Sequence, residues 1–87
     1  MHTDEYEISL NRERIVCKSS IKRIQEFFAI MERKHKKTTD VFVEEYDSGK
    51  LSGNEEDFTA WRSNYESLKQ WQELERQYEE LFQKMKI

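Results

Sequence analysis

Hydrophobic residues recur every three or four positions along the last third of the chain, with neither Gly nor Pro between residues 54 and 87. This spacing places them on one face of a helix, which we expect to cover residues 55–86. The resulting aromatic-rich stripe consists of Phe58, Trp61, Tyr65, Leu68, Trp71, Leu74, Tyr78, Leu81 and Met85. Beside it, the charged residues Arg62, Glu66, Lys69, Glu73, Arg76, Glu80 and Lys84 alternate in sign, which is typical of a solvated face that stiffens an exposed helix.

A second stripe predicts a first helix over residues 20–37. It consists of Ile21, Ile24, Phe28 and Met31, with Phe27 and Ile30 flanking it and Cys17 and His35 extending it by one step at each end. Steps of three and four residues are those of a heptad seam. The basic residues at the end of this segment complement the partial negative charge of a helix C-terminus.

A short helix is expected over residues 40–47. Thr38, Thr39 and Asp40 provide a capping signal before it, and Gly49 follows it where a left-handed residue is favoured. Leu51 can then fold back onto this helix, and Asn54 is an N-cap candidate for the long helix.

The first 18 residues are harder to assign. Tyr6, Ile8 and Leu10 alternate with polar residues, which favours a short strand, but no second strand is evident to pair with it. We therefore expect residues 1–18 to form a tail or a lead-in to the helix, and residues 19–87 to form a single helical domain.

These elements predict an all-α fold, a helical hairpin or three-helix arrangement with coiled-coil-like packing. The long helix would measure about 48 Å and the first about 27 Å, so part of the aromatic stripe would overhang. We expect residues 58–68 to pack internally and residues 71–85 to face another chain, although the opposite division stays open. The predicted dimer or partner interface comprises Trp61, Tyr65, Leu68, Trp71, Leu74, Tyr78, Leu81 and Met85.

Composition and charge narrow the expected partners. The chain is 36% hydrophobic and 38% charged, with a net charge of −3. Residues 1–38 hold nine Lys/Arg against six Asp/Glu, whereas residues 39–87 hold six against twelve. The acidic second half suits a basic protein partner and disfavours nucleic acid, although solvated helix faces explain these acids more simply. A basic cluster at residues 33–37 is the one candidate nucleic-acid footprint, and a helix C-terminal charge preference explains it better.

No catalytic, cofactor or metal motif is evident, so we expect a non-enzymatic protein. His2 and His35 have no carboxylate or thiol at a defined spacing, and the acids at residues 44–57 lack the pattern of a calcium loop. The single cysteine, Cys17, excludes an intrachain disulfide and favours a reducing compartment. No apolar run approaches the ~18 residues of a membrane span, and the N-terminus does not resemble a signal peptide, so a cytoplasmic location is expected.

Residues 31–51 (MERKHKKTTDVFVEEYDSGKL) and 53–61 (GNEEDFTAW) resemble a family of short helical bacterial and archaeal proteins. Members of this family are often encoded next to a small toxin candidate and are considered candidate antitoxins. The resemblance covers residues 31–70, and it implies a protein that binds and occludes a partner such as a toxin. The alternative is a self-associating structural helical dimer with no regulated partner.

Overall fold

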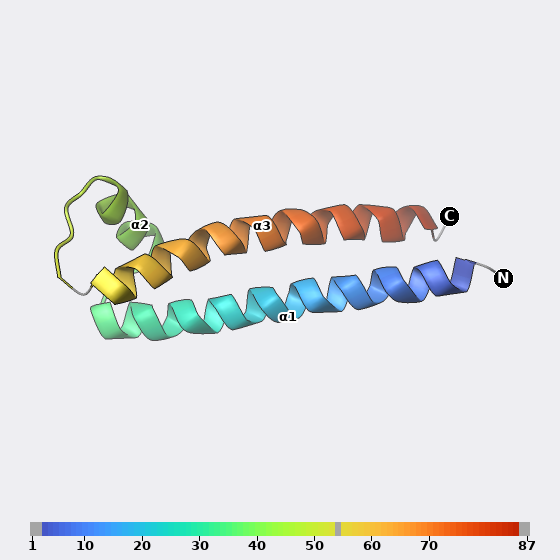
Figure 1. The fold of residues 1–87 in the computed structure, drawn as a ribbon, viewed down its shortest axis with the longest axis horizontal. Coiled ribbons are helices and arrows are strands. Elements are labelled where there is room, and N and C mark those ends of the chain that lie inside the picture. Colours follow the sequence, from blue (N-terminus) through green and yellow to red (C-terminus); the bar gives the residue numbers. More distant parts are fainter. Residues whose placement is uncertain (1–2, 54, 86–87) are drawn as a thin grey trace.

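The computed structural model describes residues 3–53 and 55–85, which form three helices. Helix α1 spans Thr3–His35, α2 spans Thr39–Asp47 and α3 spans Glu55–Met85. The two long helices lie side by side and antiparallel, with α2 at the end where the chain turns back (Figure 1). The molecule is elongated, measuring 57 × 20 × 17 Å. The predicted all-α fold with a long C-terminal helix is confirmed.

Helix α1 begins much earlier than expected. The prediction of a tail or short strand over residues 1–18 is wrong for residues 3–18, which are helical and agree with the alternative of a lead-in to the first helix. Leu10 and Cys17 are buried and continue the seam of Ile24 and Met31 in steps of seven residues, whereas Ile8 is 59% exposed. With 33 residues in α1 and 31 in α3, the expected overhang of the long helix is absent.

The core lies at the α2 end of the hairpin and draws on all three helices. It consists of Ile24, Phe28, Met31, Phe42, Phe58 and Trp61. Phe42 of α2 stacks on Trp61 of α3 with ring centroids 4.0 Å apart, and both side chains are fully buried. The indole Nε1 of Trp61 donates a hydrogen bond to Thr39 Oγ1 (3.1 Å), which itself donates to Glu32 Oε2 (2.8 Å). These bonds satisfy the polar groups that α2 carries into the core.

Local signals define the ends of α2 as the sequence predicts. The Thr38 side chain caps its first turn by accepting a hydrogen bond from the Val41 amide (3.3 Å). Gly49 is left-handed (φ 77°), and the amide of Lys50 donates to the Glu45 carbonyl (2.9 Å), a Schellman-type ending. Leu51 packs back against the core, as expected. The predicted cap at Asn54 falls outside the described residues.

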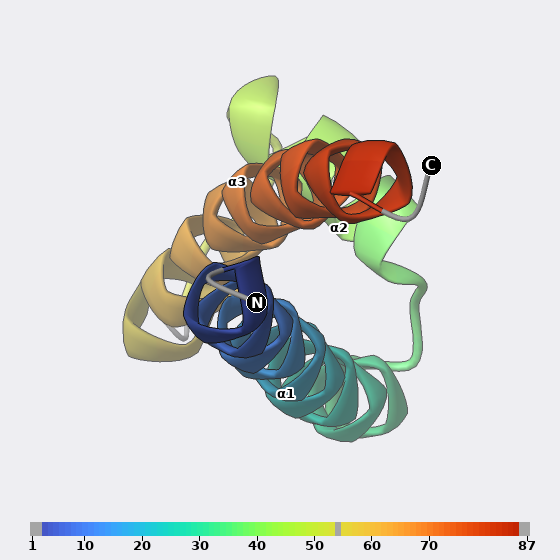
Figure 2. The same ribbon diagram turned by 90° about the vertical axis from the view of Figure 1, so that its right-hand side faces the viewer.

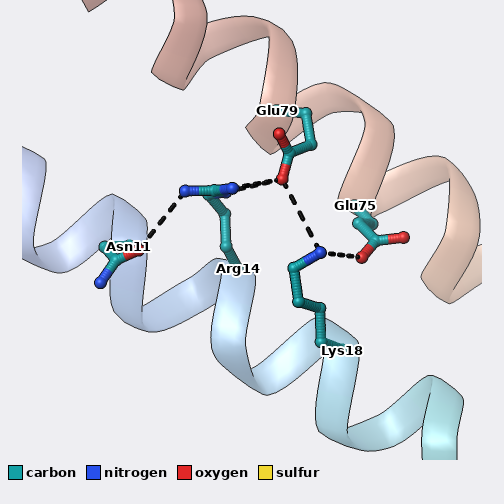
Figure 3. Close-up of polar contacts among 5 residues, drawn as sticks. All are labelled: Asn11, Arg14, Lys18, Glu75 and Glu79. Atoms are coloured by element: carbon teal, nitrogen blue, oxygen red, sulfur yellow. Dashed lines mark hydrogen bonds and ion pairs between the residues drawn. The ribbon is translucent and has the colours of Figure 1, made fainter.

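The opposite end of the hairpin is joined by charged side chains (Figure 3). Arg14 donates from Nε and Nη2 to Glu79 Oε1 (2.8 and 2.5 Å), and Lys18 Nζ lies 3.1 Å from Glu75 Oε2. The Arg14 guanidinium also lies 4.2 Å from the centre of the Phe82 ring. The side of α3 that faces α1 here therefore carries Glu75, Glu79 and Phe82, instead of the apolar stripe that the sequence emphasises.

Candidate interaction surface

The structure divides the predicted interface residues into two groups. Trp61 is fully buried in the core and cannot contact a partner, while Tyr65 and Leu68 are half-buried against that core. Further along α3, Trp71 also packs partly against that core, Leu74 and Tyr78 are likewise half-buried, and Leu81 is 39% exposed. The side chain of Met85 is not among those that the structure describes. The expectation that residues 58–68 pack internally is met at Phe58 and Trp61.

Residues 71–81 of the stripe stay partly exposed because the apolar stripe winds around α3, away from the side that contacts α1. Residues that face α1 recur every seven positions, at Trp61, Leu68, Glu75 and Phe82. The stripe takes three successive steps of three residues, from Tyr65 to Leu74, and so falls one position behind this seam. One position on a helix is a rotation of about 100°. This run of short steps is the sequence signal that locates the open surface, and the sequence analysis missed it.

Helix α1 contributes the other wall of this surface. An open hollow of about 480 Å³ lies between the long helices, bordered by Ser20, Arg23 and Phe27 of α1 and by Ser67 and Trp71 of α3. Helical steps of three and four residues extend this border along both helices. It reaches Val16 (43% exposed) and Ile30 (55% exposed) on α1, and Leu74, Tyr78 and Leu81 on α3.

We call this surface the apolar face, and it consists of Val16, Phe27, Ile30, Trp71, Leu74, Tyr78 and Leu81. A separate hollow bordered by Thr39, Tyr65 and Leu68 lies beside α2. The apolar face therefore occupies the side of the hairpin that α2 leaves uncovered. In Figure 2, which looks along the hairpin, α2 is seen to one side of the pair of long helices.

The charged ladder of α3 lies away from the apolar face. Arg62 pairs with Asp47 of α2 (Nε to Oδ1, 2.9 Å), and Arg76 pairs with Glu73 and with Glu80 (2.6 Å). The hydrogen bond from Arg76 lowers the pKa of the Glu73 carboxyl, because it stabilises the charged form. These charged side chains pair with carboxylates of the same chain on an exposed surface, in keeping with the expected solvated face.

The basic cluster at residues 33–37 is mostly engaged within the chain. Lys34 Nζ lies 2.7 Å from Asp57 Oδ2 and Lys37 Nζ lies 2.5 Å from Glu45 Oε1. The imidazole of His35 is 3.1 Å from the same Asp57 oxygen, and hydrogen bonds from Lys34 and His35 lower the pKa of that carboxyl. These contacts dock the end of α1 onto α2 and α3, which accounts for two of the lysines without nucleic acid.

The thiol and the potential metal ligands of the described residues are placed as follows. Cys17 is buried, and this burial raises the pKa of its thiol, so the reactive thiolate is disfavoured. Residues 3–53 and 55–85 contain no cluster of three or more His, Cys, Asp or Glu side chains arranged to hold a metal ion. Within the same part of the chain, no helix has the length and apolar character needed to cross a membrane.

No family model, curated protein or solved structure matches this chain. The resemblance of residues 31–70 to candidate antitoxins therefore stays a prediction.

Proposed function

We propose that this protein is a non-enzymatic interaction module that binds a helix of another protein on its apolar face. The observation that carries the proposal is the polar seam at the end of the hairpin. Arg14 and Glu79 occupy the contact between α1 and α3, while Trp71 and Leu74 lie at its open side. Contiguous exposed apolar surface is typical of interaction sites, and large aromatic residues are enriched where binding energy concentrates.

The shape of the face suits a helix laid along the groove between α1 and α3. Small polar residues, Ser20 and Ser67, border the hollow beside Phe27 and Trp71, so a large side chain from a partner could insert there as a knob. A helix bound along this groove would complete a three-helix bundle. It would also lose access to its own target, which is how an antitoxin-like protein would act by occlusion.

The basic partner suggested by the charge of the second half would engage a different region. Asp40 and Glu44 of α2 and Glu55 and Glu56 of α3 are exposed and form no ion pair with the described residues. These acids lie at the α2 end of the hairpin, so a basic partner such as a toxin would add contacts at that end. The alternative, a structural homodimer, would instead cover the apolar face with a second copy.

Two isoleucines of α1 provide a matched test of the face. Ile30 belongs to the apolar face, whereas Ile15 lies outside it, about 100° around α1 from Val16, and both side chains are 55% exposed. The chain would be mixed with a synthetic amphipathic peptide that carries a leucine stripe, and the binding would be measured by fluorescence anisotropy. We expect Ile30→Asp to weaken the complex at least about tenfold and Ile15→Asp to leave it unchanged.

Two results would count against the proposal. One is an equal effect of both substitutions, and the other is a wild-type chain that neither binds the peptide nor associates with itself. Circular dichroism of both variants checks that the helices persist, which the exposure of both side chains favours.

A further inference from the structure

A second stripe of residues runs along the outer side of α1, away from the core. Each member lies two residues from a buried residue, as Ile8 does from Leu10 and Ile15 from Cys17, which is a rotation of about 200° around the helix. We call it the outer stripe, and its exposed members are Ile8, Arg12, Ile15, Ser19, Arg23, Glu26 and Ile30.

The outer stripe has the same spacing in both directions from Ser19. Its steps are 4, 3 and 4 residues back to Ile8 and again 4, 3 and 4 residues forward to Ile30. Two antiparallel copies of such a helix, related by a two-fold axis at Ser19, place each residue before Ser19 opposite the residue equally far after it. The 22 residues from Ile8 to Ile30 span about 33 Å of helix.

We infer that two copies of this chain pair through their outer stripes, antiparallel and with the two-fold axis at Ser19. In this register Ile8 lies opposite Ile30 of the second copy, and Arg12 lies opposite Glu26 of the second copy. The symmetry forms each of these pairs twice. Serine is small, so the helices can approach closely at the axis.

Both kinds of pair use side chains that are available in the single chain. Ile8 is 59% exposed and Ile30 is 55% exposed, so covering them removes apolar surface from water. Arg12 and Glu26 are exposed and form no ion pair with the described residues. Their contact therefore adds an ion pair without breaking an existing one.

The other positions of this register also match in character. Ile15 lies opposite Arg23 of the second copy and, beside the stripe, Val16 lies opposite Lys22 of the second copy. The aliphatic stem of an arginine or lysine can cover an apolar side chain while its charged group stays in water. The register therefore gives each exposed aliphatic residue of the outer stripe an apolar neighbour.

The two-fold pattern favours a second copy over other occupants. An isologous dimer requires one surface to complement itself about an axis, whereas a different protein, a membrane or a nucleic acid gives no reason for such symmetry. This dimer goes beyond the proposed function because Phe27, Trp71 and Leu74 lie outside the outer stripe. Ile30 alone belongs to both surfaces, so each copy keeps its groove.

The first test measures the solution mass of the full chain by light scattering over a dilution series. We expect a reversible dimer whose dissociation constant rises at least about tenfold in Ile8→Asp. Leu81→Asp is the matched control on the apolar face, where the side chain is 39% exposed, and it should leave the dimer unchanged. Circular dichroism checks that both variants keep their helices.

A pair of charge reversals tests the register. Arg12→Glu places like charges opposite each other in the dimer, and so does Glu26→Arg, so each variant alone should dimerise about tenfold more weakly. An equimolar mixture of the two variants should dimerise again, because each chain then supplies the charge that the other needs. Contact within one chain cannot produce this recovery, since the two positions are 14 residues, or about 21 Å, apart on α1.

A cross-link tests the position of the axis. In a chain that carries Cys17→Ala, Ser19→Cys should be joined between copies by a short bis-maleimide, whereas the exposed Ser63→Cys on α3 should not. Light scattering of both variants confirms that the dimer is retained.

Three results would overturn the inference. The first is a chain that stays monomeric at every concentration. The second is a dimer that Leu81→Asp dissociates and Ile8→Asp does not, which would assign the second copy to the apolar face. The third is a mixture of the two charge variants that does not recover the dimer. The proposed function is tested separately by peptide binding.

Discussion

Thr39 connects the three helices through one hydroxyl group. It accepts a hydrogen bond from Trp61 Nε1 inside the core and donates one to Glu32, which is half-buried at the edge of that core. Thr39→Val keeps the shape of the side chain but leaves the indole N–H unpaired. We predict a loss of about 1–3 kcal/mol in the free energy of unfolding, measured by urea denaturation. Thr59→Val at an exposed position of α3 is the control and should change it little; equal effects would contradict the role of the hydroxyl.

Lys36 holds a backbone conformation that suits glycine better. It ends α1 with a φ of 56°, in the left-handed region where a Cβ atom is unfavourable. We predict that Lys36→Gly raises the melting temperature, with a gain of up to about 1 kcal/mol. Lys22→Gly in the middle of α1 should instead destabilise by about 1 kcal/mol. A loss of stability in Lys36→Gly would show that the lysine side chain outweighs the strain.

Asp57 links stability to pH through its contacts with Lys34 and His35. Because its pKa in the folded state lies below the ordinary 3.8, its contribution is complete above that value and disappears as the pH falls through the lowered pKa. We predict that the stability difference between wild type and Asp57→Asn is largest near neutral pH and shrinks below about pH 3.8. Urea unfolding across this range is the measurement, with Glu56→Gln as control; a difference that stays constant would rule out the titration of Asp57.

Among the elements, the contact between α1 and α3 changes character along its length. At the far end from α2, Arg14 is only 18% exposed and depends on Glu79. Glu79→Leu alone leaves this guanidinium without its carboxylate partner, so we predict a loss of about 1–3 kcal/mol in the free energy of unfolding. Adding Arg14→Leu should restore stability to at least the wild-type level, because two leucines can pack where the ion pair lay. A double-mutant cycle by chemical denaturation measures this coupling, and simple additivity of the two changes would contradict it.

The sequence was informative where local chemistry decides the structure. Thr38 and Gly49 determine the ends of α2 through backbone hydrogen bonds within a few residues, and these were predicted correctly. The start of α1 was not predicted correctly, because the alternation of Ile8 and Leu10 with polar residues fits a strand pattern as well as a helix pattern. The rotation of α3 depends on Arg14, which lies 65 residues from Glu79 in the chain. No local pattern in either helix contains that pairing.

At the scale of the whole molecule, stability and binding are separated along one hairpin. The α2 end holds the stacked aromatic core and the turn, whereas along the remaining length the ion pairs of Arg14 and Lys18 flank the buried Leu10 and Cys17. This arrangement keeps Trp71 and its neighbours at the surface without weakening the core. Because a partner would bind only the folded hairpin, its binding should also raise the free energy of unfolding by mass action.

The exposure of Trp71 tests the central claim most directly. The chain has two tryptophans, so Trp61→Phe leaves Trp71 as the single fluorescent indole, and Trp71→Phe provides the buried control. Acrylamide quenching would be measured on the monomer and again with a synthetic amphipathic peptide that carries a leucine stripe. We predict that Trp71 is quenched readily in the free chain and protected in the complex, while Trp61 is protected in both. A Trp71 already protected in the free monomer would contradict the account, because the stripe would then be packed within the chain.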